Sequence, residues 1–173
     1  MNYAAIKKTD VANGPGVRVS LFVSGCTHHC KGCFNSETWD FDYGQLYTQA
    51  VENEILKALE PSYIRGFTAL GGEPFEEKNR YVVLELMRKI KEHFPEKDIW
   101  CYTGYDYEKD LLLWIQKGRS EVAEMLGLID VLVDGEFVEE QKNLKLAFRG
   151  SMNQRLIDVQ ASAKSQCVVK MKL

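Results

Sequence analysis

The chain has 173 residues, of which 45% are hydrophobic and 27% charged, and its formal net charge is −3. These values are typical of one globular domain with an ample core, so a metal is not needed to hold the chain together. The composition excludes two classes of partner. The sequence contains neither the Lys and Arg block of sequence-independent nucleic-acid binding nor the ~20-residue apolar run of a membrane span. We therefore expect no nucleic-acid partner and no membrane partner.

The N-terminal segment and the cysteine count indicate a compartment. The first ten residues, "MNYAAIKKTD", lack the apolar region of a secretory signal. The chain contains five cysteines, and an odd number without such a signal favours a reducing compartment. We expect a cytoplasmic protein whose clustered cysteines serve metal or redox chemistry.

Strand-like and helix-like stretches alternate along the chain. The strand-like stretches are short and run into turns: residues 17–25, 64–74, 98–104 and 129–137. The helix-like stretches carry apolar residues near a 3.6-residue period: residues 46–60, 79–94, 107–118 and 120–127. Asn79 is the expected N-cap of the second helix, while Pro61, Gly118 and Gly127 are expected to end the others. The alternating tail at residues 166–173 predicts a last edge strand.

This alternation predicts an α/β fold, with residues 1–173 forming a single domain around a mainly parallel sheet. With four to six strands, such a sheet can curl into part of a barrel without closing. In parallel sheets the chemistry gathers beyond the carboxyl ends of the strands. The informative turns follow predicted strands in this way: residues 25–35, 71–74, 103–104 and 134–137. We therefore expect these turns to form one site.

Cys26, Cys30 and Cys33 lie within eight residues in a C-x3-C-x2-C pattern, whereas Cys101 and Cys167 stand alone. A structural zinc site usually has four ligands, which commonly come from two separated pairs of residues. This chain has no second pair. To supply the fourth ligand of a zinc site, His28 or His29 would have to fold back onto the ion that the three cysteines bind. A 4Fe–4S cluster, held by three thiolates from one loop, would keep one iron open to a small molecule. The spacing favours the cluster over zinc.

A family resemblance extends this interpretation. The three cysteines followed by Phe34 resemble the cluster loop of the radical S-adenosylmethionine enzymes, and Gly71-Gly72-Glu73-Pro74 resembles that family's Gly-Gly-Glu-Pro motif. Further stretches resemble, in order, the activating enzymes of anaerobic (class III) ribonucleotide reductase: "NGPGVR", "LFVSGC", "CFN", "DIW", "YTGY", "VLVDGEF" and "RGSMNQR". The similarity covers residues 1–157. The tail at 158–173 lies outside it and is given no role.

The resemblance implies a partial, open (βα) barrel and a reaction. A 4Fe–4S cluster on Cys26, Cys30 and Cys33 would cleave S-adenosylmethionine reductively, and the 5′-deoxyadenosyl radical would generate a glycyl radical on the reductase. The backbone around Gly32, Cys33 and Phe34 would border the adenine, and Gly72 would contact the methionyl end. Thr103 and Gly104 would approach the ribose. The implied partners are the anaerobic ribonucleoside-triphosphate reductase and a flavodoxin-type or other low-potential electron donor.

Several alternatives stay open at this point. The chain could activate another glycyl-radical enzyme of the pyruvate formate-lyase type, or be an iron–sulfur electron carrier or a zinc-binding module. His28 and His29 are expected to be solvated loop residues or partner contacts, and Cys101 and Cys167 small buried side chains. Four further residues have no assigned role: Glu73, Asp134, Arg149 and Asn153.

Overall fold

The computed structural model describes residues 1–171, which form an α/β fold around one open seven-stranded sheet. The strand order is β3-β1-β2-β4-β5-β6-β7. The strands are β1 (Asn2–Asp10), β2 (Val17–Val23), β3 (Gln45–Leu46), β4 (Ile64–Gly71), β5 (Asp98–Tyr102), β6 (Val131–Asp134) and β7 (Arg155–Asp158). The α/β class and the open sheet are as expected, but the strands outnumber the four to six predicted.

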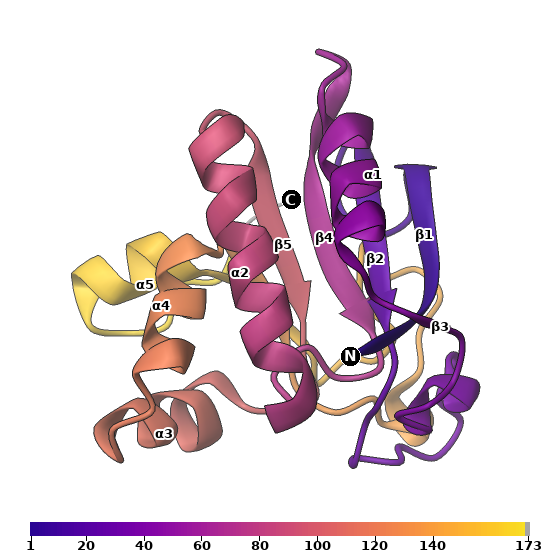
Figure 1. Ribbon diagram of the computed structural model, residues 1–173. Helices are drawn as coiled ribbons and strands as arrows, with labels where there is room; N and C mark the ends of the chain where they lie inside the picture. The colour runs from indigo at the N-terminus through magenta and orange to yellow at the C-terminus, as the bar shows by residue number, and fades with distance from the viewer. Residues whose placement is uncertain (172–173) are drawn as a thin grey trace.

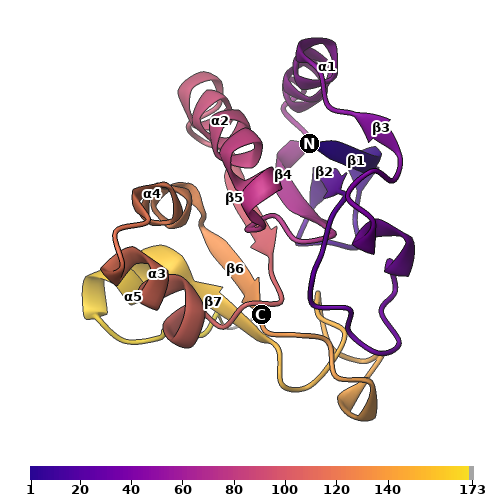
Figure 2. The same cartoon turned by 60° about the horizontal axis from the view of Figure 1, so that its bottom comes forward.

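The four central strands, β2, β4, β5 and β6, are parallel, and the outer strands β1, β3 and β7 pair antiparallel. The connecting helices are α1 (Gln49–Leu59), α2 (Glu77–His93), α3 (Leu113–Gln116) and α4 (Ser120–Leu128), and α5 (Val159–Ser165) follows β7. Helices α1, α2 and α4 lie on one side of the sheet (Figure 1). Figure 2 shows the strands following a curve with these helices outside it. The segment between β6 and β7 runs on the other side.

The main core lies between the sheet and these helices. Leu21 of β2 and Phe67 of β4 are fully buried in it, together with Ile55 of α1 and Met87 of α2. A smaller cluster on the opposite face contains Trp100, Val131, Val133 and Leu156. Because side chains alternate along a strand, β5 supplies Ile99 and Cys101 to the first cluster and Trp100 to the second.

The helices begin and end within a few residues of the expected positions, with physical reasons for the differences. Helix α2 begins at Glu77 after Glu76, so the prediction of Asn79 as its N-cap is wrong. Residues Tyr107–Leu112 form a π-helical turn capped by the Asp106 side chain, which accepts from the backbone N–H groups of Glu108 and Lys109. Helix α4 continues through Gly127 to Leu128, so this glycine does not end it.

Four elements were not predicted: β1, β3, β7 and α5. Strand β1 lacks a clean alternation of apolar and polar residues, since its middle is "AAIKK". The edge strand expected at residues 166–173 is not formed in the described part. That part makes one isolated bridge, Lys170 to Ile157, and residues 172–173 lie outside the described residues. Across residues 1–171, every helix is too short or too polar to cross a membrane.

Candidate functional site

The loops that follow β2, β4, β5 and β6 meet at the carboxyl edge of the parallel strands. They surround a cavity of about 670 Å³. Among its lining residues are Cys26, Cys30 and Cys33 from the first loop and Gly72 and Glu73 from the second. Thr103 and Gly104 come from the third loop, and Gly135 and Phe137 from the fourth. The predicted convergence of the four turns is confirmed, as the parallel order of these strands requires.

The three clustered cysteines are free and half-buried at this cavity. Burial raises the pKa of the Cys26 thiol to about 12 and also raises the pKa of Cys30. In the metal-free protein these thiols are therefore protonated at neutral pH. A bound metal reverses this preference, because thiolates are its ligands and binding releases their protons.

The three cysteines open from one loop onto the shared cavity. Their soft thiolates can bind zinc or an iron–sulfur cluster, in which each iron is usually held by its own cysteine. The cavity beside them leaves space for a small molecule, which fits a cluster with one open iron better than a closed structural zinc site.

The cysteine loop rests on the short helical turn Ser36–Trp39. The Gly25 and Cys26 backbone N–H groups donate to the carbonyls of Thr38 and Trp39 over 2.8 and 3.2 Å. Gly25 has a φ of +98°, and an added Cβ would lie 2.1 Å from the Phe41 ring. A glycine is therefore required where the chain leaves β2.

The Gly-Gly-Glu-Pro turn packs directly against the cysteine loop. The Gly72 N–H donates to the Val23 carbonyl over 2.7 Å, and the Glu73 N–H donates to the Gly25 carbonyl over 2.9 Å. An added Cβ at Gly72 would lie 2.6 Å from the Gly25 oxygen. Because Gly72 has no side chain, the backbones of the two loops can approach each other closely. The same lack of a side chain leaves space in the cavity.

Glu73 links the second loop to the third. Its side chain is 1% exposed. Oε1 accepts from the Thr103 hydroxyl over 2.9 Å, and Oε2 accepts from the Gly104 N–H over 2.8 Å. The carboxylate also accepts from the Phe75 N–H, which closes its own turn. Glu73 therefore positions the Thr103-Gly104 turn at the cavity.

His28 is not the solvated loop residue that the sequence suggested. Its side chain is 10% exposed and lies between two carboxylates, with Nδ1 2.7 Å from Glu136 Oε1 and Nε2 3.3 Å from Glu73 Oε2. Burial lowers its pKa, but the hydrogen bonds and charges of Glu73 and Glu136 outweigh burial and raise the pKa to about 9. His29 is exposed, as expected, and stacks on Trp39 at 4.7 Å.

Phe34 and Gly32 contact the segment after β6. The Phe34 ring meets Phe137 edge-on at 5.3 Å, and the Lys142 ammonium lies 4.8 Å from its centre. Phe34 lines the cavity, but Gly32 does not. A Cβ on Gly32 would lie 2.8 Å from the Glu139 carboxylate, so this glycine faces that side chain. The segment that follows β6 therefore packs against the cysteine loop and supports it.

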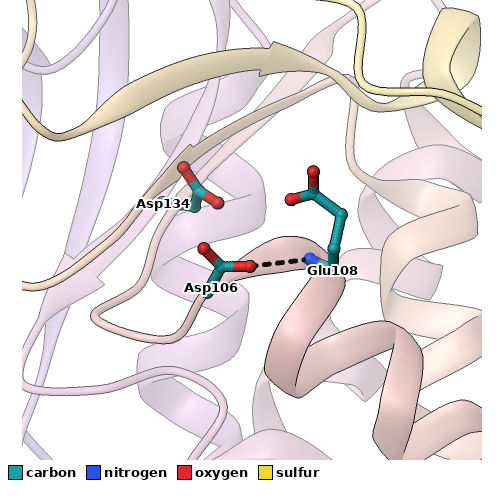
Figure 3. Close-up of side chains that lie close together, drawn as sticks. All are labelled: Asp106, Glu108 and Asp134. Atoms are coloured by element: carbon teal, nitrogen blue, oxygen red, sulfur yellow. Dashed lines mark hydrogen bonds between the residues drawn. The ribbon is translucent and has the colours of Figure 1, made fainter.

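Asp134 belongs to a separate acidic group beside the site, with Asp106 and Glu108 (Figure 3). The Arg155 guanidinium ion-pairs with all three carboxylates, at 2.6 Å from Glu108 and 3.4 Å from Asp106. The Tyr107 N–H donates to Asp134 over 2.9 Å. Through Arg155 and the Tyr107 N–H, this group holds β6, β7 and the π-helical turn together.

Four residues considered in the sequence analysis remain: two in the turn before β7 and the two lone cysteines. Arg149 lines the cavity and donates to the Gln154 carbonyl, whereas Asn153 donates to the Glu136 carbonyl. Cys101 is buried as expected, but Cys167 is exposed.

One residue that organises the cavity rim was not singled out from the sequence. Gln154 accepts from the Gly150 and Ser151 N–H groups and donates to the Gly135 carbonyl. Its signal was the "RGSMNQR" stretch, in which no single side chain stands out.

Comparison with known proteins places the chain in a family. Residues 12–157 match a family described as a 4Fe-4S single cluster domain. The chain is similar to anaerobic ribonucleoside-triphosphate reductase-activating proteins of Vibrio cholerae and phage T4. The first is 44% identical over 89% of this chain and 96% of the relative, and the second 45% over 90% and 93%. The Escherichia coli K12 protein of the same name is 40% identical over 89% and 96%. The chain therefore belongs to the family of anaerobic ribonucleoside-triphosphate reductase-activating proteins.

Proposed function

We propose that this chain activates an anaerobic ribonucleoside-triphosphate reductase as a radical S-adenosylmethionine oxidoreductase. The observation that carries the proposal is the single cavity onto which the three cysteines, Gly72 and the Thr103-Gly104 turn all open. The names of the relatives supply the target, since each is an activating protein for that reductase. The curved, open sheet is compatible with the partial (βα) barrel of the wider family.

Cys26, Cys30 and Cys33 would hold three irons of a 4Fe–4S cluster, with the fourth open to S-adenosylmethionine. The cavity, at about 670 Å³, lies in the size range of small-molecule sites. Cys33 and Phe34 would border the adenine and Gly72 the methionyl end. Gly32 would act there through its backbone conformation alone, because it faces Glu139.

The bound cluster would supply one electron for reductive cleavage of the C5′–S bond of S-adenosylmethionine, and the resulting 5′-deoxyadenosyl radical would take a hydrogen atom from a glycine of the reductase. This chain's own residues bind and orient. Glu73 holds the Thr103 hydroxyl and the Gly104 N–H at the cavity, where they would receive the ribose. Phe34 and Phe137 form an apolar wall that would exclude water on one side.

Two further parts of the proposal rest on the sequence alone. The electron would come from a flavodoxin-type or other low-potential protein, as the resemblance implies. The odd number of cysteines favours the cytoplasm as the compartment.

The test is electron paramagnetic resonance of anaerobically reconstituted, reduced protein mixed with S-adenosylmethionine and a class III reductase. We expect a glycyl-radical doublet that requires S-adenosylmethionine and disappears in Cys26→Ala. The matched control is Cys101→Ala, which should keep the doublet because Cys101 is buried in the core and does not line the cavity.

Three outcomes would contradict the proposal. A cluster signal altered by S-adenosylmethionine without a doublet would point to another substrate, such as a pyruvate formate-lyase type enzyme. Loss of the cluster in Cys101→Ala would indicate a four-cysteine electron carrier. Protein that holds zinc and no iron would make the three cysteines structural.

A further inference from the structure

His28 touches the three other loops that form the cavity. It belongs to the cysteine loop after β2, and its Nε2 faces Glu73 of the loop after β4. Its ring meets Tyr105, after β5, edge-on with centres 4.4 Å apart. Its Nδ1 donates to Glu136, after β6, over 2.7 Å. One side chain thus connects segments up to 108 residues apart.

The packing around His28 is close as well as polar. An added Cβ on Gly104 would lie 2.7 Å from the imidazole ring, so the Thr103-Gly104 turn rests directly on it. Glu73 holds the same turn, because its Oε2 accepts from the Gly104 N–H. The same oxygen faces His28. Because Glu73 is buried, the His28 imidazole beside Oε2 lowers the free-energy cost of keeping the charged carboxylate at the cavity.

We propose that His28 is a positioning residue: it fixes the cysteine loop against Glu73 and Glu136, and so sets the distance between the cysteines and the Gly72 and Thr103-Gly104 turns. This inference rests on the proposed function, since these turns would receive S-adenosylmethionine. His28 itself touches neither iron nor substrate in this role. Its effect is on the binding of S-adenosylmethionine, through the loops that it joins.

Neighbouring His29 offers a matched control. It lies in the same loop, is exposed, stacks on Trp39 and makes no contact with Glu73 or Glu136. Its φ of +50° favours Asn as a replacement, because Asn tolerates left-handed backbone better than other side chains. His29→Asn removes an imidazole from the loop without removing the connection.

Two measurements on the full chain test the proposal. The first is amide hydrogen exchange of the metal-free protein, which needs neither cluster nor S-adenosylmethionine. We expect His28→Ala to speed exchange in peptides covering residues 26–34 and 103–106, and His29→Asn to leave both unchanged. The second is the S-adenosylmethionine dissociation constant of reconstituted protein, read from the change in its reduced-cluster spectrum. We expect His28→Ala to weaken binding roughly tenfold or more at unchanged iron content.

Conservative variants separate the two carboxylate contacts, the Nδ1 hydrogen bond to Glu136 and the ion pair of Nε2 with Glu73 at 3.3 Å. Asn places an amide nitrogen near the position of Nδ1 and Gln near that of Nε2. His28→Gln should therefore restore the contact with Glu73 and recover more S-adenosylmethionine affinity than His28→Asn, which restores the contact with Glu136.

Three results would overturn the proposal. One is His28→Ala behaving like His29→Asn in both measurements. Another is a loss of iron from His28→Ala with an unchanged dissociation constant, which indicates a structural role alone. The third is faster exchange with unaltered affinity. If wild-type protein binds no S-adenosylmethionine, the proposed function fails, and the exchange measurement still decides whether His28 joins the loops.

Discussion

At the scale of single residues, Arg18 shows how a buried charge shapes the rim of the cavity. Its side chain is 0% exposed, and Nη1 pairs with Asp98 at 2.5 Å. The guanidinium also donates to the Thr68 hydroxyl and the Phe67 carbonyl, each over 2.7 Å. The Thr68 hydroxyl donates in turn to the carbonyl of Asn13, a cavity-lining residue. Arg18 therefore fastens the "NGPGVR" segment to the sheet.

Two arginines that share Asp98 allow a matched prediction. Arg18→Met should lower the free energy of unfolding by about 3 kcal/mol, because it removes one partner of a buried, hydrogen-bonded pair. Arg65 pairs with the same carboxylate at 3.0 Å, but its side chain is 56% exposed. Arg65→Met should therefore cost less than about 1 kcal/mol. Urea unfolding of the metal-free protein measures both, and equal losses would contradict the role given to Arg18.

At the scale of elements, the start of α2 is joined to two loops of the site. The Asn79 side-chain amide donates to three carbonyls: Ser24 over 2.9 Å, Glu73 over 3.0 Å and Gly25 over 3.3 Å. Asn79 is buried in the first turn of the helix. The sequence pattern suggested a cap that serves the helix, whereas the structure shows a donor that serves the cysteine loop and the Gly-Gly-Glu-Pro turn.

This arrangement predicts that an acidic residue at position 79 will destabilise the protein, the opposite of its usual effect in the first turn of a helix. An Asp in the first turn normally stabilises a helix through the macrodipole. Asn79→Asp should instead destabilise the protein more than Asn79→Ala, because the carboxylate would face three carbonyl oxygens. Asn79→Ala should cost about 1–3 kcal/mol, because the Ser24 carbonyl loses its donor, whereas the Gly25 and Glu73 carbonyls keep backbone donors. Thermal unfolding of the metal-free variants orders them, and an Asp variant more stable than the Ala variant would refute this role.

At the scale of the whole molecule, the core is formed by apolar side chains of the sheet and its helices. The buried cluster between the sheet and its helices runs from Tyr3 of β1 to Val159 of α5. The three cysteines lie outside it, in a loop that rests on its own backbone hydrogen bonds. We therefore expect a metal bound by these cysteines to be added to a formed fold, unlike a zinc finger that folds only with its ion.

Iron removal should accordingly leave the fold in place. The triple variant Cys26→Ala, Cys30→Ala, Cys33→Ala should unfold cooperatively, with a midpoint within about 5 °C of the metal-free wild type, since these changes remove about 1 kcal/mol or less. Far-UV circular dichroism during heating measures this. A broad transition, or a loss of helix signal at room temperature, would mean that the cluster loop is part of the folding core.

Much of the architecture could be predicted from local patterns. The four central strands and the helices that connect them follow periodicity and glycine or proline stops. The outer strands could not, because β1 and β7 are defined by the strands they pair with and not by their own alternation. The expected edge strand at the tail failed for the same reason. Its alternating residues make a single bridge to β7 among the described residues.

The chemistry open to the candidate site follows from a short local stretch of the chain. Three thiols within eight consecutive residues, placed after a strand of a parallel sheet, offer soft metal ligands at a carboxyl edge whatever the details of packing. The side-chain partners of the residues around the site depend on the three-dimensional fold. The roles of His28, Asn79, Arg18 and Asp134 depend on groups between 21 and 108 residues away. Spacing along the chain carries no information about such distant contacts, and folding brings these groups together through the order of the strands.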